Sequence, residues 1–273
     1  MAILFVLFYL GSATTRGQAA LPGQKFQEDT VLLQFRHLDS LSRAQLLTKA
    51  DLDFIGRHLG QISSKDRLFK WCLTAPAMID SLIGNGNYAK VVCNNVIYRE
   101  EIKPAIQTGQ ATGQEPHWKS IEKNVHRKYG AAFDHDKLLQ ARIDWYKSRR
   151  EAQLYAHYLA IQIDRQLTLH QIQPGWMGIW ALNNQAWAVF QYDSIKKDLR
   201  MALRWSGQVI SETDPPSAGY LDTKANLLYK LGKKGAALKL ESQAAAMLPL
   251  NTDIISNYHK MQAGTATWPD KME

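Results

Sequence analysis

The spacing of small residues between Gly219 and Asn251 constrains the fold of this chain more than any other feature. Small, turn and closing residues follow one another at steps of 7, 5, 7 and 5 residues, namely Ala225, Gly232, Ala237, Ala244 and Pro249. Two antiparallel helices can touch along their length only where the facing side chains lack bulk, and proline ends a helix that it cannot continue. The pattern therefore predicts a hairpin of two helices with its turn at Gly232.

The same pattern occurs one unit earlier. Pro215 precedes Pro249 by 34 residues and Ala202 precedes Ala237 by 35, whereas the step from Ala186 to its counterpart is longer because of a longer inter-helix loop. A period of 34 residues is typical of tetratricopeptide repeats, whose helical hairpins stack into a solenoid. We therefore expect an all-α fold with a tetratricopeptide-like solenoid over residues 111–262, in which the best repeats are 184–217 and 218–251.

Three runs in this region resemble a known family. They are LNNQAW at 182–187, ALRWS at 202–206 and YLDTKANLLYKLG at 220–232. These runs are similar to the C-terminal helical half of certain exported bacterial thioredoxin-family proteins, and LTKADLDFI at 47–55 resembles the opening of that half. In such relatives a separate domain with a W-C-x-x-C motif carries the redox chemistry. The resemblance implies a helical half without that domain, which is absent from this sequence.

Residues 20–110 are expected to form a less regular helical region. Thr48 and Asp51 have the spacing of a capping box at the start of a helix. A helix from Tyr88 is expected to be interrupted or kinked near Pro104. Segment 107–117, rich in Gly, Gln and Thr, is predicted to be a linker, and residues 263–273 are predicted to be a flexible tail.

The first residues predict export. The uncharged apolar run Ala2–Leu10 has nine residues, whereas a membrane-spanning helix needs about 20. Small residues follow, so cleavage of a signal peptide after Ala19 fits the pattern. We expect residues 1–19 to be a signal peptide and the remaining chain to be periplasmic or otherwise envelope-associated, with no membrane span.

The two cysteines, Cys72 and Cys93, leave two interpretations open. In an exported protein they could form a disulfide. Their apolar neighbours also suit two buried thiols, because cysteine behaves as a small apolar side chain. The run that begins Trp71-Cys72 has Ala75 where a thioredoxin motif would have its second cysteine, so dithiol exchange within that run is not expected.

No linear motif for a catalytic centre, a cofactor or a metal ion is evident. The nearest ligand-like run, Asp134-His135-Asp136, is more typical of a helix N-terminus. The net charge is +8, but the basic residues are scattered, and nucleic-acid binding requires a continuous basic stripe. We therefore expect a protein that is not an enzyme, has no cofactor or metal site and does not bind nucleic acid.

Aromatic and amide residues at helical spacing provide the candidate binding site. They line either the core between hairpins or a groove that binds a protein or peptide; the candidates are Trp180, Asn183, Asn184, Trp187 and Lys230, with Tyr155 and Tyr158 as further ones. The expected function is that of a protein-interaction scaffold or adaptor. The alternative is a helical accessory to a thiol–disulfide redox system.

Overall fold

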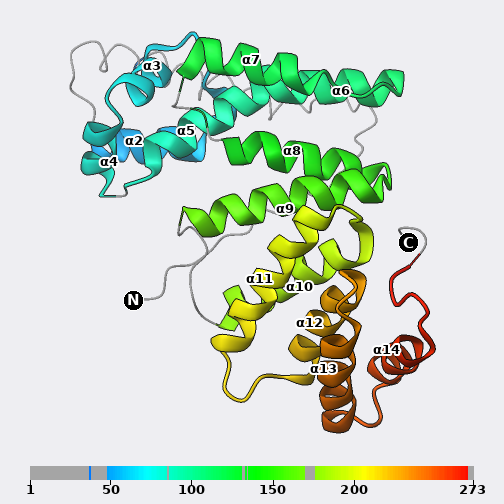
Figure 1. Cartoon of the computed structure of the whole chain (residues 1–273). Coiled ribbons are helices and arrows are strands. Elements are labelled where there is room, and N and C mark those ends of the chain that lie inside the picture. The colour runs from blue at the N-terminus through cyan, green and yellow to red at the C-terminus, as the bar shows by residue number, and fades with distance from the viewer. Residues whose placement is uncertain are drawn as a thin grey trace, which may run out of the picture. The chain divides into compact units, whose positions relative to one another are not determined.

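The protein is represented by a computed structural model that describes residues 37, 48–84, 86–130, 133, 135–169 and 176–269. Every regular element in these ranges is helical, and no strand occurs among the described residues (Figure 1). The prediction of an all-α fold is therefore confirmed. The chain divides into two compact units between Val92 and Cys93. The predicted signal peptide, residues 1–19, lies outside the described residues.

The N-terminal unit contains short helices. Its elements are α2 (Lys49–Arg57), the 3₁₀ turn η1 (Leu59–Gln61), α3 (Arg67–Thr74), α4 (Pro76–Ile83) and the first half of α5 (Tyr88–Ile97). The predicted capping box opens α2: the Thr48 amide donates to Asp51 Oδ2 at 2.9 Å, and the Asp51 amide donates to Thr48 Oγ1 at 3.3 Å. A further bond, from the Ala89 amide to Asp80 Oδ1 at 2.8 Å, joins α4 to the first turn of α5.

The C-terminal unit begins with the second half of α5 and continues to the end of the described chain. Its further elements are the π-helical turn η2 (Tyr98–Ile102), α6 (Lys103–Thr112), α7 (Trp118–Tyr129), α8 (His135–Ser148), α9 (Ala152–Thr168), α10 (Trp176–Tyr192), α11 (Lys196–Ser211), α12 (Ala218–Lys230), α13 (Lys234–Met247) and α14 (Thr252–Ala263). The predicted irregularity near Pro104 is present, since η2 interrupts the helix and Pro104 lies in the first turn of α6.

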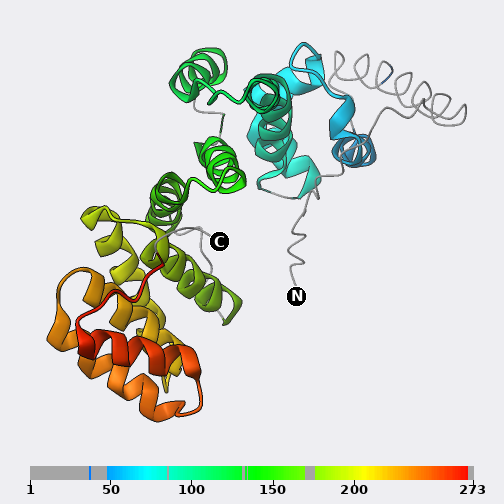
Figure 2. The same cartoon turned by 90° about the vertical axis from the view of Figure 1, so that its right-hand side faces the viewer.

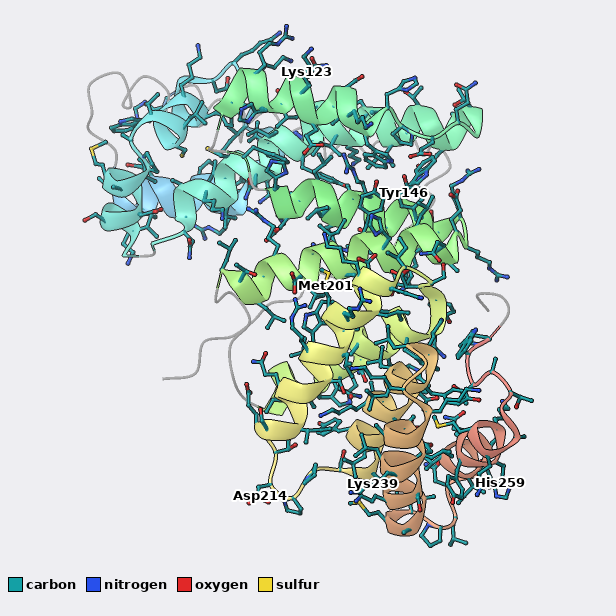
Figure 3. The ribbon with its side chains drawn as sticks, viewed as in Figure 1. Lys123, Tyr146, Met201, Asp214, Lys239 and His259 are labelled. Atoms are coloured by element: carbon teal, nitrogen blue, oxygen red, sulfur yellow. The ribbon has the colours of Figure 1, made fainter. Side chains whose placement is uncertain are left out.

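Consecutive helices of this unit pack in pairs. Helices α8 and α9, α10 and α11, and α12 and α13 contact each other, and α14 packs against α13 and α12 (Figures 1 and 2). Contacts also join α10 to α12 and α11 to α12, so neighbouring pairs are packed together. Side chains fill the spaces between these helices (Figure 3). The main core combines α9, α10 and α11 and includes the fully buried Phe190 and Trp205.

The small residues of the sequence pattern lie where these helices meet. The five alanines of this pattern are completely buried, namely Ala186, Ala202, Ala225, Ala237 and Ala244. Gly232 ends α12 with a φ of 82°, a left-handed conformation that favours glycine because a Cβ would be strained there. The predicted turn between α12 and α13 is thus confirmed, and Leu248 to Asn251 separates α13 from α14.

Two expectations about boundaries differ from the structure. The predicted linker at 107–117 begins inside α6, which continues to Thr112. The division between units falls at Val92 rather than near residue 110, because η2 packs against α7 and α8 and keeps the following helix with the C-terminal unit. Local composition predicted a linker, but the contacts of η2 with α7 and α8 decide the boundary.

The structure also differs from the predicted flexible tail at one residue. Trp268 packs against the main core, with its ring centroid 6.4 Å from that of Phe190 and 6.4 Å from that of Tyr229. The tail is therefore anchored at this position by aromatic contacts with α10 and α12.

Candidate functional site

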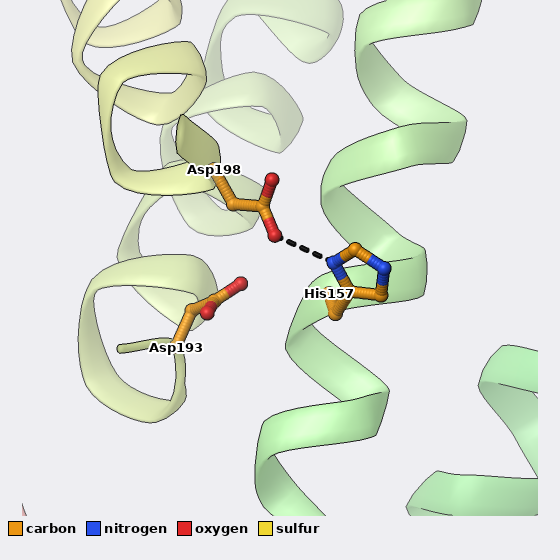
Figure 4. A group of neighbouring side chains, drawn as sticks. All are labelled: His157, Asp193 and Asp198. Atoms are coloured by element: carbon orange, nitrogen blue, oxygen red, sulfur yellow. Dashed lines mark hydrogen bonds and ion pairs between the residues drawn. The ribbon is translucent and has the colours of Figure 1, made fainter. Parts of the chain in front are cut away.

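Three polar side chains from different elements converge inside the C-terminal unit. His157 comes from α9, Asp193 from the loop between α10 and α11, and Asp198 from the first turn of α11 (Figure 4). One ligand-type atom of each lies within 4.8 Å of the other two. His157 Nδ1 lies 2.6 Å from Asp198 Oδ2. Both aspartates are buried, whereas the His157 side chain is 31% exposed. The cluster therefore borders solvent on the histidine side only.

A glutamine on α9 orients the loop that carries Asp193. Gln153 Nε2 donates to Asp193 Oδ1 at 2.5 Å, and Gln153 Oε1 accepts hydrogen bonds from the Ser194 amide and hydroxyl at 2.9 and 2.7 Å. The Ile195 amide also donates to Asp193 Oδ1, at 2.8 Å. Two donors thus hold one oxygen of the Asp193 carboxylate in place. The geometry of the carboxylate then fixes the position of its second oxygen.

The second oxygen of Asp193 has a different environment. Oδ2 is buried and has no hydrogen-bond donor among the described residues. Burial raises the pKa of Asp193, hydrogen bonds from Ile195 and Gln153 oppose this effect, and the neighbouring Asp198 carboxyl raises the pKa further. A buried carboxylate oxygen without a partner is costly. This site therefore favours a proton or a cation between the two aspartates.

Lys230 on α12 lies beside the same loop but bonds elsewhere. Its Nζ donates to the carbonyl oxygen of Phe190 at 2.6 Å and lies 4.9 Å from the ring centroid of Trp268. Burial lowers the pKa of Lys230 to about 8, and the charge of Asp193 opposes this shift. The ammonium therefore caps the end of α10, where unsatisfied carbonyl groups attract a cation.

A second buried acidic pair joins α12, α13 and α14. Asp222 Oδ1 accepts hydrogen bonds from Asn226 Nδ2 at 2.8 Å and Asn257 Nδ2 at 3.1 Å. Glu241 is completely buried next to Asp222, and burial raises the pKa of Glu241 to about 10, with the Asp222 charge as a further cause. Glu241 is therefore protonated at neutral pH, and neither of its carboxyl oxygens has a hydrogen-bond partner among the described residues. The two residues form a buried acidic pair between helices in which one acid is neutral.

An open pocket of about 580 Å³ lies at the start of α7, beside α8 and α9. Arg142 lines it, with the guanidinium carbon 5.7 Å from the ring centroid of Trp118 and 5.2 Å from that of Tyr158. Arg142 Nη2 also donates to Glu122 Oε2 at 3.0 Å. The guanidinium is thus already shared between two rings and a carboxylate, so we regard this pocket as a secondary candidate.

The five residues predicted to form a groove do not share one surface. Trp180 and Asn184 are exposed and lie four residues apart on α10, so they share a stripe of that helix. Asn183 is buried. Trp187 is half-buried against the main core, with its ring centroid 4.8 Å from that of Phe190, and Lys230 caps α10 instead. Tyr155 and Tyr158 are also half-buried against the core.

The cysteines are buried thiols, and no disulfide joins Cys72 to Cys93. The interpretation as a disulfide is therefore not supported, and the interpretation as buried thiols agrees with the structure. Burial raises the pKa of the Cys93 thiol to about 11. Since the thiolate is the reactive form, Cys93 is poorly suited to disulfide exchange at neutral pH.

The His157 cluster was not predicted from the sequence. His157 and Asp198 are 41 positions apart, and Asp193 stands in a polar stretch that is typical of a surface loop. The polar residues 191–197 between two apolar helices were the only hint in the sequence. Such polarity predicts an exposed loop, and it does not show that a carboxylate within the loop is buried.

Comparisons with known proteins do not indicate a function, so functional inference rests on the fold and on this cluster. No family model matches the chain, and no significantly similar curated protein or solved structure was found. None of the described helices is both long enough and apolar enough to cross a bilayer.

Proposed function

We propose that this protein binds a protein or peptide partner as a scaffold or adaptor and not as an enzyme. One observation carries the proposal: the alanines that define the sequence repeat are the residues buried between paired helices of the C-terminal unit. Helical hairpins stacked in this way form extended surfaces that typically bind other polypeptides.

A tetratricopeptide-like arrangement is part of the proposal. The pair α12 and α13, Ala218 to Met247, falls within the predicted repeat 218–251. The predicted repeat 184–217 begins within α10 and ends just before α12. Support also comes from the contacts of α10 with α12 and of α12 with α14, since the first helices of successive repeats are neighbours in such a solenoid.

The exposed stripe of α10 provides the most specific contact surface. Trp180 is 49% exposed, and Asn184 lies one turn further along the same helix. A large aromatic ring beside an amide is a combination that protein interfaces favour, because the ring supplies buried area and the amide supplies directed hydrogen bonds. We assign partner binding to this pair.

The compartment is proposed from the sequence alone. The apolar start and the small residues that precede Ala20 favour export to the bacterial cell envelope. A role as helical accessory of a thiol–disulfide system is the alternative, but the buried cysteines do not favour it.

The test is a photo-crosslinking capture from native envelopes with the chain from Ala20 onward. A crosslinker replaces Asn184, and the captured species is compared with that of a Trp180→Ala variant carrying the same crosslinker. Lys239, exposed on α13, provides a control crosslinking position (Figure 3).

We expect one reproducible partner at position 184, lost on Trp180→Ala and not captured from position 239. Equal capture from positions 184 and 239, or no capture at either, would contradict the proposal.

A further inference from the structure

The His157 cluster has the composition and spacing of a metal-ligand set. Its three donor atoms are an imidazole nitrogen and two carboxylate oxygens, all within 4.8 Å of one another and contributed by three separate elements (Figure 4). Imidazole and carboxylate together are ligands that Zn²⁺ and related transition ions accept. Clusters of acidic residues are common without a metal ion. The hydrogen bonds of each carboxylate oxygen therefore decide whether a ligand is needed here.

One of these oxygens is buried without a hydrogen-bond donor. Asp193 is 0% exposed, and its Oδ2 has no partner among the described residues. Gln153 and Ile195 hold the other oxygen of the same carboxylate. Figure 4 shows the Asp193 carboxylate directed toward the space beside Asp198 and His157. A buried carboxylate oxygen without a donor is costly, so its presence in this cluster supports a bound cation.

The balance of charge supports a cation at this point. Two buried carboxylates face a single imidazole. The basic group Lys230 directs its Nζ to the carbonyl oxygens of Phe190 and Gln191. The charge of Asp193 only partly offsets the effect of burial, which lowers the pKa of Lys230. A divalent ion would compensate both carboxylates at once.

We propose that His157, Asp193 and Asp198 bind one divalent transition-metal ion of the Zn²⁺ class. The ion binds to Nδ1 of the imidazole and to one oxygen of each carboxylate, and it leaves a fourth position for water or a ligand. Its entry path is the exposed side of His157. This inference is independent of partner binding by α10.

The required rearrangement is small. Ligand atoms around a tetrahedral Zn²⁺ ion are separated by roughly 3.3 Å, given bonds of about 2.0 Å. The 2.6 Å contact between His157 and Asp198 would open by about 0.7 Å to reach this separation, and any separation near 4.8 Å would shorten by about 1.5 Å. Changes of this size are within the range of side-chain rotation.

Gln153 would support the site from outside the ligand set. A polar group that orients a ligating carboxylate strengthens metal binding, and its removal typically weakens affinity by roughly 10- to 100-fold. Gln153 bonds to Asp193 and also fixes the Ser194 amide and hydroxyl. It therefore provides a variant that leaves all three ligands in place.

The experiment is a titration of the chelator-treated full chain with Zn²⁺, followed by calorimetry, with Co²⁺ absorption as a second readout. We expect one ion per chain and a Co²⁺ spectrum typical of a low-coordinate site. Binding should be lost in His157→Gln and weakened roughly 10- to 100-fold in Gln153→Ala. His135→Gln is the matched control, since His135 pairs with Glu122 outside the cluster.

Absence of one-to-one binding would overturn the proposal, as would equal affinities of wild type and Gln153→Ala. Loss of binding in His135→Gln would assign the ion elsewhere and also overturn it. Circular dichroism before metal addition verifies that each variant folds. Should His157→Gln fail to fold, the comparison of Gln153→Ala with His135→Gln decides the question.

Discussion

A hydrogen bond from Lys230 to Phe190 connects two helical pairs. The Lys230 ammonium, on α12, donates to the Phe190 carbonyl oxygen near the end of α10 at 2.6 Å, and it also lies 5.5 Å from the centroid of the Phe190 ring. The charge thus faces the negative end of a helix dipole and the face of an aromatic ring together. This geometry gives Lys230 a structural role in the contact between α12 and α10.

Replacement of this lysine should therefore reduce stability. Lys230→Met keeps an apolar stem but removes the donor, and we expect the free energy of unfolding to fall by about 1–2 kcal/mol. Urea denaturation measures the change. Lys239→Met on the exposed surface of α13 is the control; equal effects of the two substitutions would argue against the capping role.

Glu241 should make stability depend on pH. Its pKa is about 10 in the folded chain and about 4 when unfolded. Between these values the folded state holds a proton that the unfolded state has released, so stability falls as pH rises. We expect stability to fall as the pH rises from 5 to 9, by at most about 1.4 kcal/mol per pH unit, which is the limit for one fully titrating group.

Glu241→Gln should flatten this dependence and raise stability at pH 8, because the amide remains neutral. Denaturation at several pH values between 5 and 9 measures the effect. An unchanged slope in the variant would show that Glu241 is not the titrating group.

Alanines on opposite faces of α13 should respond differently to added volume. Ala244 is completely buried at the helix contact, whereas Ala246 is exposed. Ala244→Leu overfills the interface and should cost about 1–3 kcal/mol. Ala246→Leu should change stability by less than about 0.5 kcal/mol. Thermal unfolding of both variants gives the comparison, and similar melting temperatures would contradict the assigned contact.

Two glycines should also differ in their tolerance of alanine. A Cβ at Gly109 would lie 2.6 Å from the Gln114 carbonyl oxygen and 2.9 Å from Trp145 Cη2. Gly109→Ala should therefore destabilise the protein by about 1–3 kcal/mol. A Cβ at Gly207 meets only the flexible end of Lys224 at 4.0 Å.

Gly207→Ala should stabilise the protein by about 0.5–1 kcal/mol, because alanine is the better helix former. Denaturant unfolding of the two variants tests both signs. Destabilisation of similar size in both variants would show that the close contact of the Gln114 carbonyl oxygen with position 109 does not distinguish the two glycines.

Both thiols should resist alkylation in the folded chain. At pH 8 the raised pKa of Cys93 leaves on the order of a hundredfold less thiolate than an ordinary cysteine has. Iodoacetamide labelling with mass-spectrometric readout measures the rate, and a Ser242→Cys variant supplies an exposed reference on α13. Labelling of Cys93 as fast as the introduced thiol would restore the redox alternative.

Local steric requirements made part of this fold predictable. Ala225, Gly232 and Ala237 could be assigned to contact, turn and contact because two close helices and a left-handed turn each restrict the residues allowed. The capping box of Thr48 and Asp51 was equally local, since its bonds join residues three apart. Such features depend on near neighbours in sequence, which a single chain displays.

Features that depend on distant partners were not predictable. Lys230 was a candidate for the binding groove, whereas its hydrogen-bond acceptor lies 40 positions away in the sequence. Asp193 and His157 likewise have ordinary local surroundings, and their proximity follows from the packing of α9 against α10 and α11. Segment 107–117 has the composition of a linker, yet Gly109 is buried under Trp145.

The position of Trp268 has a consequence for engineering this protein. Its ring rests on α10 and α12 after the chain has passed α14, so the last described segment closes over helices that precede it. A designed hairpin inserted directly after Ala263, in line with the existing pairs, would compete with that ring for its place. Adding a helical pair at this end would therefore require a new side chain to cover Phe190 and Tyr229.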